Sequence, residues 1–423
     1  MTRKVFVGIC IIFSLSYSSI YGQEGSASPY SFFGIGELRF KGVVENQMMG
    51  GVSVYPDSLY LNLKNPAAYG KLQLTAYAVG GSYNLLNIKN DEVKESSSLG
   101  TFDYLALGLP ISKKIGIGFG VLPYTSVGYR LISVDESQEL DVLDQFTGEG
   151  GLNRAFFSIG YAITEGLSIG ATGNYDFGKI ENSNLRIREN VELGTRETNA
   201  SSLSGMDFNF AVNYQKDIGK GYTIYSSLLY APETNIASEN ERTIATIAFI
   251  DGREIPVEEV EVDLDALGLE ETDLVLPSSI TFGLGLGKKN KWFVGGEYEF
   301  KKNSKFDNPF VTIDNLRYED ASRISVGGFY IPRYDSFTNY FSRIVYRLGV
   351  RYEQTGINLN NSSVDDFGIS FGLGLPVGIS KLNVGFEIGQ RGDTSFGKIQ
   401  ENYFNIRIGL SLSDKWFIKN KYQ

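Results

Sequence analysis

The chain has 423 residues, a formal net charge of −10, 49 Gly, 26 Tyr, 28 Phe, one Cys and no His. The lack of His and the single Cys exclude disulfides, Cys or His metal sites, Ser-His-Asp triads and imidazole acid–base catalysis. Abundant Tyr, Phe and Gly favour an all-β protein, and an acidic balance without a basic stripe argues against a nucleic-acid partner. Paired carboxylates remain possible in principle, but we expect no enzyme activity, no metal and no cofactor.

Residues 1–22 have the pattern of a secretory signal peptide. Arg3 and Lys4 form a positive start, the apolar run VFVGICIIFSLSYSS follows, and Gly22 offers a small residue before the cleavage point. The run is too short for a confident membrane-spanning helix. Cys10 would be acylated in a lipoprotein, but few apolar residues precede it, so we interpret it as part of the apolar run.

Residues 23–71 show neither strand alternation nor a helical stripe over the stretch NQMMGGVSVYPDSLYLNLKNPAAYG. They carry several large apolar side chains, among them Phe32, Phe33, Met48 and Met49. Left in water, this segment would expose those groups. We therefore predict that it folds into the interior of the protein as a hatch, or plug.

From residue 72 onward, apolar and polar residues alternate with a period of two. In FNIRIGLSL, for example, Phe404, Ile406 and Ile408 share one face while Arg407 lies on the other. Segments of about ten residues with one apolar face suit tilted strands of a membrane barrel; a soluble sandwich would show the same alternation. The expected strands are 72–84, 100–109, 115–127, 151–163, 167–180, 202–215, 222–231, 277–286, 292–300, 321–331, 344–356, 365–375, 382–390 and 402–412.

The connections between these strands alternate in length. Links such as 85–99, 128–150, 181–201 and 232–276 are long, whereas the links that follow every second strand are mostly short turns. Short periplasmic turns and long outer loops are typical of outer-membrane barrels, and a soluble sandwich gives no reason for the asymmetry. We therefore predict a transmembrane antiparallel β-barrel of about fourteen strands over 72–412, in the outer membrane of a Gram-negative-type bacterium, with membrane lipid as a partner.

If the apolar face meets lipid, the other face lines the lumen, and it carries glycines and charges. The glycines either permit strand bending or leave space for a docked segment. The charges either pair with one another or set the selectivity of a polar passage. The inward glycines are Gly116, Gly118, Gly120, Gly283, Gly285, Gly287, Gly368, Gly372 and Gly374, and the inward charges are Glu297, Glu299, Arg323, Arg347, Arg351, Glu353, Glu387 and Arg407.

Two further segments carry a distinct composition. Residues 232–276 hold thirteen Asp or Glu against two Arg; they could bind Ca²⁺, but they lack EF-hand spacing and equally suit a solvated loop or short helix. Residues 413–423 follow the last strand, and we expect a periplasmic tail. Trp416 and Phe417 would anchor at the membrane interface, and the last six residues would extend into the periplasm or contact a partner.

The segment before the first strand resembles the N-terminal region of the FadL-like proteins, the long-chain fatty-acid transporter family. That family carries Met-Gly-Gly, then an Asp, then Asn-Pro-Ala before its first strand. The matching residues here are Met49, Gly50 and Gly51, then Asp57, then Asn65, Pro66 and Ala67. The resemblance implies a fourteen-stranded barrel with an N-terminal hatch.

The resemblance also implies the import of a small hydrophobic molecule. In the family, substrate passes from the outer loops into an apolar pocket and leaves sideways through the wall or past the hatch. Here the lumen face is polar, so a pocket would come from Phe32, Phe33, Met48 and Met49, unless these four only anchor the hatch. The other residues that we expect in the hatch or its pocket are Gly50, Gly51, Asn65 and Pro66. The alternative function is a non-transporting barrel subunit of an outer-membrane secretion or assembly complex, with other outer-membrane proteins as partners.

Overall fold

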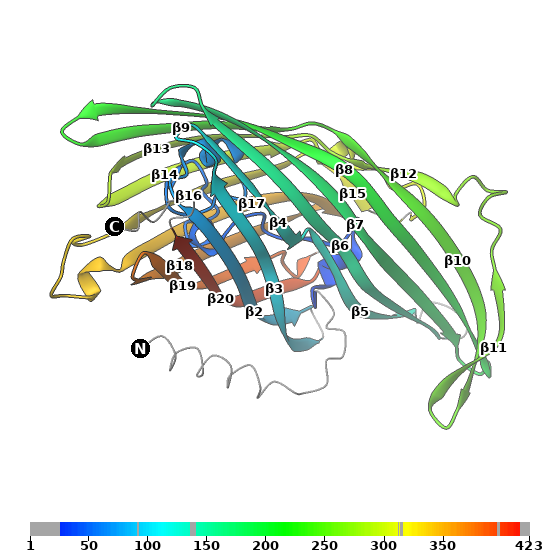
Figure 1. Cartoon of the computed structure of the whole chain (residues 1–423). Helices are drawn as coiled ribbons and strands as arrows, with labels where there is room; N and C mark the ends of the chain where they lie inside the picture. The colour runs from blue at the N-terminus through cyan, green and yellow to red at the C-terminus, as the bar shows by residue number, and fades with distance from the viewer. Residues whose placement is uncertain are drawn as a thin grey trace, which may run out of the picture.

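The computed structural model describes residues 26–90, 93–135, 141–311, 313, 316–395 and 398–414. It is a closed antiparallel β-barrel of fourteen strands (Figure 1), which confirms the predicted fold class. Closure comes from the pairing of the first wall strand, β2, with the last, β20, over Thr75–Lys89 and Gln400–Asp414. None of the helices among the described residues is long and apolar enough to span a membrane. The predicted signal peptide and residues 415–423 of the predicted tail lie outside the described residues.

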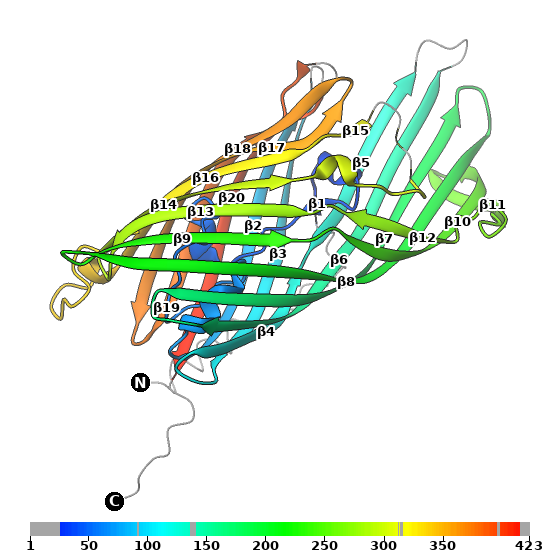
Figure 2. The same ribbon diagram turned by 90° about the horizontal axis from the view of Figure 1, so that it is seen from above.

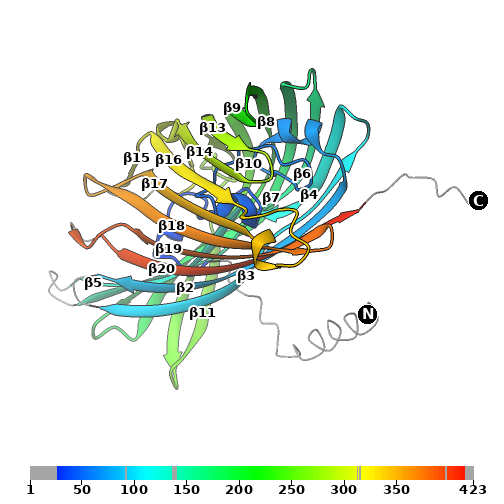
Figure 3. The ribbon, with the colours of Figure 1, turned by 90° about the vertical axis from the view of Figure 1, so that its left-hand side faces the viewer.

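Eleven wall strands are continuous and three are each built from two strands. The continuous ones are β2 (Thr75–Lys89), β3 (Lys94–Pro110), β6 (Val142–Ala162), β7 (Leu167–Arg188), β8 (Leu193–Gly219), β14 (Trp292–Lys301), β16 (Ala321–Tyr330), β17 (Val345–Leu359), β18 (Ser362–Val377), β19 (Ser380–Arg391) and β20 (Gln400–Asp414). The composite ones are β4 (Ile115–Pro123) with β5 (Thr125–Asp135), β9 (Tyr222–Ala231) with β10 (Thr234–Ile250), and β12 (Glu271–Leu276) with β13 (Ser279–Lys288). Short strands β11 (Arg253–Glu261) and β15 (Leu316–Tyr318) add to this wall, and 3₁₀ turns η3 (Asn303–Lys305) and η4 (Phe341–Arg343) lie in its loops. A further short strand, β1 (Glu37–Leu38), lies inside the wall (Figure 3).

A proline lies at or beside the break in each composite strand. Pro123 ends β4, Pro232 separates β9 from β10, and Pro277 separates β12 from β13. Proline lacks the N–H that the sheet ladder needs, so a strand bends or stops there. The three breaks divide the barrel into two parts. The lower part carries the short turns, and we call it the short-turn end. The upper part continues into the long loops, and we call it the long-loop end.

The apolar face of each strand points outward, as the alternation predicts. On β20, Ile408 and Leu412 are exposed while Asn405 and Ser411 are buried in the interior. Outward aromatic residues form bands in register across neighbouring strands. Near the short-turn end, Trp292 aligns with Tyr330, which aligns with Tyr346. Aromatic bands that flank an apolar belt are the outward pattern of membrane barrels.

All fourteen predicted strands are present, but many are longer than expected at the long-loop end. β8 runs from Leu193 to Gly219, whereas 202–215 was expected. The expectation of a loop or short helix over 232–276 is wrong, because most of that stretch forms β10, β11 and β12. β10 continues the sheet beside β8, and β11 folds back on β10 as a hairpin. At the long-loop end, the strands therefore continue to pair outside the membrane belt. Strand lengths expected from the thickness of a membrane do not predict this extension.

Residues 26–74, which we call the inner segment, lie inside the ring of strands (Figure 3). They comprise 3₁₀ turn η1 (Pro29–Phe32), β1, the helical turn α2 (Val44–Gln47) and 3₁₀ turn η2 (Pro66–Lys71). Pro66 therefore begins a 3₁₀ turn, with Asn65 as its N-cap.

Inward glycines let the backbone of the inner segment touch the wall. A Cβ on Gly327 would lie 2.1 Å from the Met49 carbonyl oxygen, and one on Gly349 would lie 2.0 Å from the Gly50 nitrogen. Gly116 similarly meets the Tyr69 carbonyl oxygen, at 2.1 Å from its would-be Cβ. These glycines leave room for a docked segment, because real Cβ atoms would not fit at such distances.

Candidate functional site

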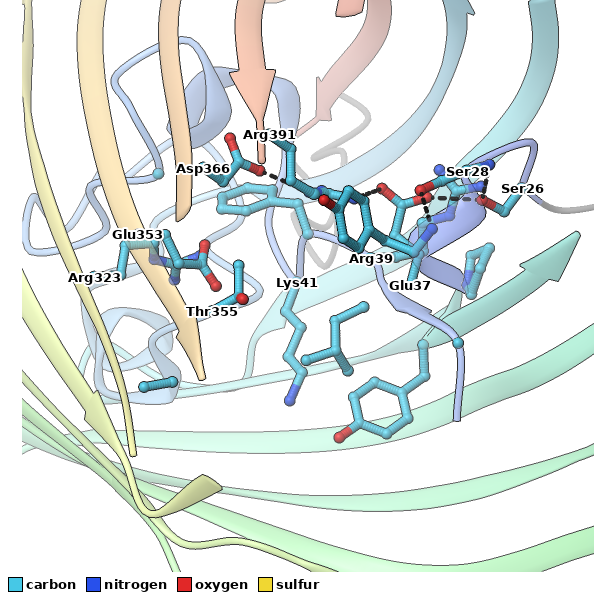
Figure 4. A pocket seen from close by; sticks show the side chains of 18 of the residues that line it. Ser26, Ser28, Glu37, Arg39, Lys41, Arg323, Glu353, Thr355, Asp366 and Arg391 are labelled. Carbon is cyan, nitrogen blue, oxygen red and sulfur yellow. Dashed lines mark hydrogen bonds and ion pairs between the residues drawn. The ribbon is translucent and has the colours of Figure 1, made fainter. Parts of the chain in front are cut away.

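A cavity of about 410 Å³ lies between the inner segment and the wall, toward the long-loop end (Figure 4). Its apolar lining includes Phe33, Ile35, Leu38 and Phe40 of the inner segment. All three prolines at the breaks of the composite strands also line it. The cavity therefore lies at the level where the wall changes direction.

Beside this cavity, two neighbouring wall strands, β3 and β5, are not hydrogen-bonded to each other over their described residues. β3 pairs with β4 only from Leu105 to Pro110, and β5 has turned away to pair with β6 over Val127–Asp135 (Figure 2). Within the described residues, the edge of β3 over 94–104 has no partner facing β5. We call this stretch the wall seam.

The inner segment partly covers the wall seam. β1 pairs with the free edge of β5, Glu37 opposite Ser126 and Leu38 opposite Thr125. The Arg39 N–H donates to the Tyr124 carbonyl at 2.9 Å and extends this contact. Leu99, Phe102 and Pro123 from the two sides of the seam all line the cavity. The cavity therefore reaches the seam, with β1 at its edge.

One side of the cavity is a network of ion pairs. Arg351 lies 3.0 Å from Glu387 and 3.3 Å from Asp366, and Arg391 lies 3.2 Å from Asp366 and 3.5 Å from Glu401. The Tyr403 hydroxyl donates to Asp366 at 2.7 Å. Each charge thus has a partner, which offsets the cost of removing it from water.

Two further lining residues, Tyr124 and Asp207, contact a buried Arg154. Its guanidinium contacts Asp176 at 2.6 Å, pairs with Asp207 and lies 3.9 Å from the centre of the Tyr124 ring. The Lys41 ammonium lies 4.6 Å from the centre of the same Tyr124 ring. Burial, followed by repulsion from Arg154, lowers the pKa of Lys41 to about 7. Figure 4 shows Lys41 directed into the cavity.

Glu37 links β1 to this network. Arg391 donates to it at 3.1 Å and the Ser26 hydroxyl donates at 2.9 Å. Burial alone would raise the pKa of Glu37, but Arg391, then Arg39 and Ser26, outweigh burial and hold it at about 2, against 4.5 ordinarily. Because the folded pKa is depressed, this stabilisation is complete above about pH 4.5 and is lost as the pH falls toward 2.

We expect acidification to release the start of the inner segment. Between pH 5 and pH 2.5, amide protection over residues 26–39, corrected for intrinsic exchange rates, should fall while protection of the wall strands is kept. Glu37→Gln should already lack this protection at pH 6 and change little on acidification. Glu165→Gln, in an exposed turn, is the matched control. Protection that is independent of pH would contradict the role of the Glu37–Arg391 pair.

The predicted residues of the inner segment take different places. Phe33, Gly50 and Gly51 line the cavity, whereas Phe32 packs edge-on against Tyr129, with ring centres 5.1 Å apart. Met48 is buried against the wall at Gly372 and Gly385.

Met49, Asn65 and Pro66 lie deeper, away from this cavity. Met49 is buried beside Val52 and Val54. The Asn65 amide donates to Asn213 at 2.8 Å, and Pro66 lies against the wall at Gly170. The four proposed pocket residues therefore do not form one pocket.

The predicted lumen charges are held in pairs. Glu299 lies 2.5 Å from Arg323, which lies 3.9 Å from Glu353, and Arg407 lies 3.0 Å from Glu387. Glu297 instead holds the inner segment: it accepts from the Ser53 N–H at 2.6 Å and pairs with Lys64 at 2.9 Å. Arg347 donates to Asn383 at 3.1 Å.

The positions of Glu37, Lys41, Tyr124 and Arg154 in this site were not predicted from the sequence. The first two lie in the irregular N-terminal stretch, and Arg154 and Tyr124 become neighbours only through strand pairing. Pro123, at the end of an alternating run, was the available signal for a break in the wall.

Comparison with solved structures shows the same fold in channels for apolar compounds. The CymD monoaromatic hydrocarbon channel aligns with a TM-score of 0.58 and 14% identity, over 89% of this chain and 99% of that one. The Pseudomonas putida toluene transporter TodX gives 0.59 and 16%, over 91% and 100%. A Pseudomonas aeruginosa FadL homologue gives 0.52 and 12%, over 89% and 98%. The resemblance to FadL-like barrels is thereby confirmed at the level of the fold.

No curated protein matches the sequence. The family described as BamG matches residues 1–423. Because this match covers the whole chain, the protein belongs to the BamG family.

Proposed function

We propose that the chain is an outer-membrane channel through which a small apolar molecule enters the cavity from the long-loop end and leaves sideways through the wall seam. The observation that carries the proposal is the continuity between the cavity and the seam, at Leu99, Phe102 and Pro123. The inner segment lies inside the ring of strands (Figure 3) and would act as a hatch that closes the direct route along the barrel axis. The apolar outward belt and aromatic bands support the membrane location, with the short-turn end in the periplasm.

The fold of the neighbours supports the ligand class. TodX is described as a toluene transporter and CymD as a monoaromatic hydrocarbon channel. In this chain Phe33, Ile35 and Leu38 offer an apolar side to the cavity, opposite a charged side. A compact apolar molecule would contact the first side, while the ion pairs of the second stay closed on one another. Passage would be driven by affinity and diffusion, without a chemical step.

Filling the cavity beside the seam should slow uptake. Leu99 lines the cavity, so Leu99→Trp is expected to lower the initial rate of radiolabelled toluene uptake by cells carrying the full chain by about tenfold or more. Leu105→Trp, on the exposed outward face just below the seam, is the matched control and should leave the rate unchanged. An unchanged rate in a correctly folded Leu99→Trp variant would rule out this route.

A second candidate is a subunit of an outer-membrane protein complex. The observation that favours it is exposed apolar side chains beyond the membrane belt: Ile255, Val257 and Val260 on β11 are 42%, 62% and 55% exposed. Purification in mild detergent discriminates the two candidates. A stoichiometric protein partner would argue against a stand-alone channel, and a monomer with bound apolar ligand would argue against a purely structural subunit.

A further inference from the structure

A second cavity, of about 250 Å³, lies on the other side of the inner segment, at the short-turn end. α2 and the turn after it separate the two cavities: Gln47 and Gly50 face the first, while Glu45, Asn46 and Met49 face the second. The second cavity has no part in the proposed route through the wall seam. It combines an aromatic wall with a charged wall.

The aromatic wall is built around Tyr55 of the inner segment. Its ring centre lies 5.2 Å from that of Tyr225, 5.0 Å from Phe293 and 5.2 Å from Phe329. Tyr55, Tyr225 and Phe329 line the cavity. Aromatic rings at these separations pack against one another and form an apolar surface on which the ring of a ligand could pack.

The charged wall carries both signs. The Lys381 ammonium lies 4.0 Å from the centre of the Tyr60 ring, and no residue of the described part forms an ion pair with it. Asp57 accepts one hydrogen bond, from the Leu59 N–H at 2.9 Å. Both Asp57 and Lys381 line the cavity, so it presents a cation with free donors and a carboxylate with free acceptor capacity.

Two buried oxygen atoms beside this wall lack partners. The Glu45 Oε2 and the Asn46 Oδ1 have no hydrogen-bond partner among the described residues, although the two side chains are only 6% and 5% exposed. The other Glu45 oxygen accepts from Asn383 at 2.9 Å and Ser411 at 2.6 Å. A buried polar atom without a partner costs free energy and calls for a donor from elsewhere.

We propose that this cavity binds a small zwitterion with an aromatic side group, of the amino-acid type. The ligand carboxylate would accept from Lys381, and its ammonium would donate to Asp57 and to the free oxygens of Glu45 and Asn46. Its ring would pack on Tyr55 and its aromatic neighbours. A ligand with a charge of only one sign would leave either Lys381 or the acidic groups without a partner. A zwitterion provides a partner for both.

Three matched probes test the charge pattern. Phenylalanine carries both charges, phenylacetate lacks the ammonium and phenethylamine lacks the carboxylate. Equilibrium dialysis of radiolabelled phenylalanine against the purified full chain should show one saturable site, and each single-charge analogue should compete at least about tenfold less well, because each leaves a buried charge unpaired. Absence of saturable binding, or equal competition by either analogue, would overturn the proposal.

Two lysine variants locate the site. Lys381→Gln should weaken phenylalanine binding about tenfold or more. Lys114→Gln, in an exposed turn at the same end, should leave it unchanged. Equal affinity in folded Lys381→Gln would place the probe elsewhere and reject this cavity. Leu99→Trp should also bind phenylalanine normally, so failure of the uptake route and failure of this site are separate results.

Discussion

Deleting residues 26–70 should leave a folded barrel that conducts ions. The ring of hydrogen bonds is complete without the inner segment, since β2 pairs with β20 and every wall strand has neighbours on both sides along its lower half. We propose that the segment acts as a hatch, so its loss should convert a closed barrel into a water-filled one. Lumen charges such as Glu297, which lose their partners in the inner segment, would then be solvated by that water.

Planar bilayers measure this result directly. The full chain should stay near the baseline of the membrane, and the deletion variant should show discrete conducting steps. Folding of the variant is checked by the heat-dependent shift in gel mobility that intact barrels show. The matched control shortens the turn between β10 and β11 by removing Asp251 and Gly252, which lie outside the barrel wall. This control variant should not conduct. A folded deletion variant with unchanged conductance would mean that the inner segment does not close the lumen.

The strands of the wall could be predicted from the sequence because lipid and lumen impose opposite demands on neighbouring residues. On β20 the alternation of Ile408 with Arg407 fixes both the strand and its orientation. Beyond the membrane belt that contrast disappears. In β11 every residue of Arg253–Glu261 is exposed, so no face is distinguished and no period marks the strand. The lengths of β8 and β10 depend on their pairing with each other, and this pairing cannot be read from the sequence of either strand alone.

The interior shows a similar division. Gly50 and Gly51 were expected residues of the hatch, and both have positive φ, 69° and 90°, which favours glycine. The wall glycines at this turn, Gly327 and Gly349, face Met49 and Gly50 but were not among the inward glycines predicted from the sequence. The wall seam depends on register, because the edge of β3 that borders it pairs, within the described residues, only with β4 up to Val121, and β5 then pairs with β6 instead. Register between strands separated by long loops is a property of the closed barrel, so composition and period could not supply it.

Gly349→Ala should loosen the inner segment while leaving the wall intact. The added Cβ would lie 2.0 Å from the Gly50 nitrogen and 2.1 Å from the Met49 carbonyl carbon, and these are backbone atoms that cannot turn aside as a flexible side chain would. The turn after α2 must therefore shift, at a cost of about 1–3 kcal/mol, the range for overpacking a close-packed interior. Gly50 also donates to the Ser370 hydroxyl at 3.1 Å, and a shifted turn would lose this bond.

Hydrogen exchange should report this change where it occurs. Amides of residues 48–53 are expected to lose about tenfold or more in protection in Gly349→Ala, the factor that corresponds to 1.4 kcal/mol. Strands β17 and β18 should exchange as before, since their pairing does not involve the new methyl group. Gly173→Ala is the matched control, because its Cβ would point outward and meet Phe208 at an ordinary 3.5 Å. If Gly349→Ala keeps full protection over 48–53, the turn has room to move, and the close approach of backbone to wall does not hold the inner segment in place.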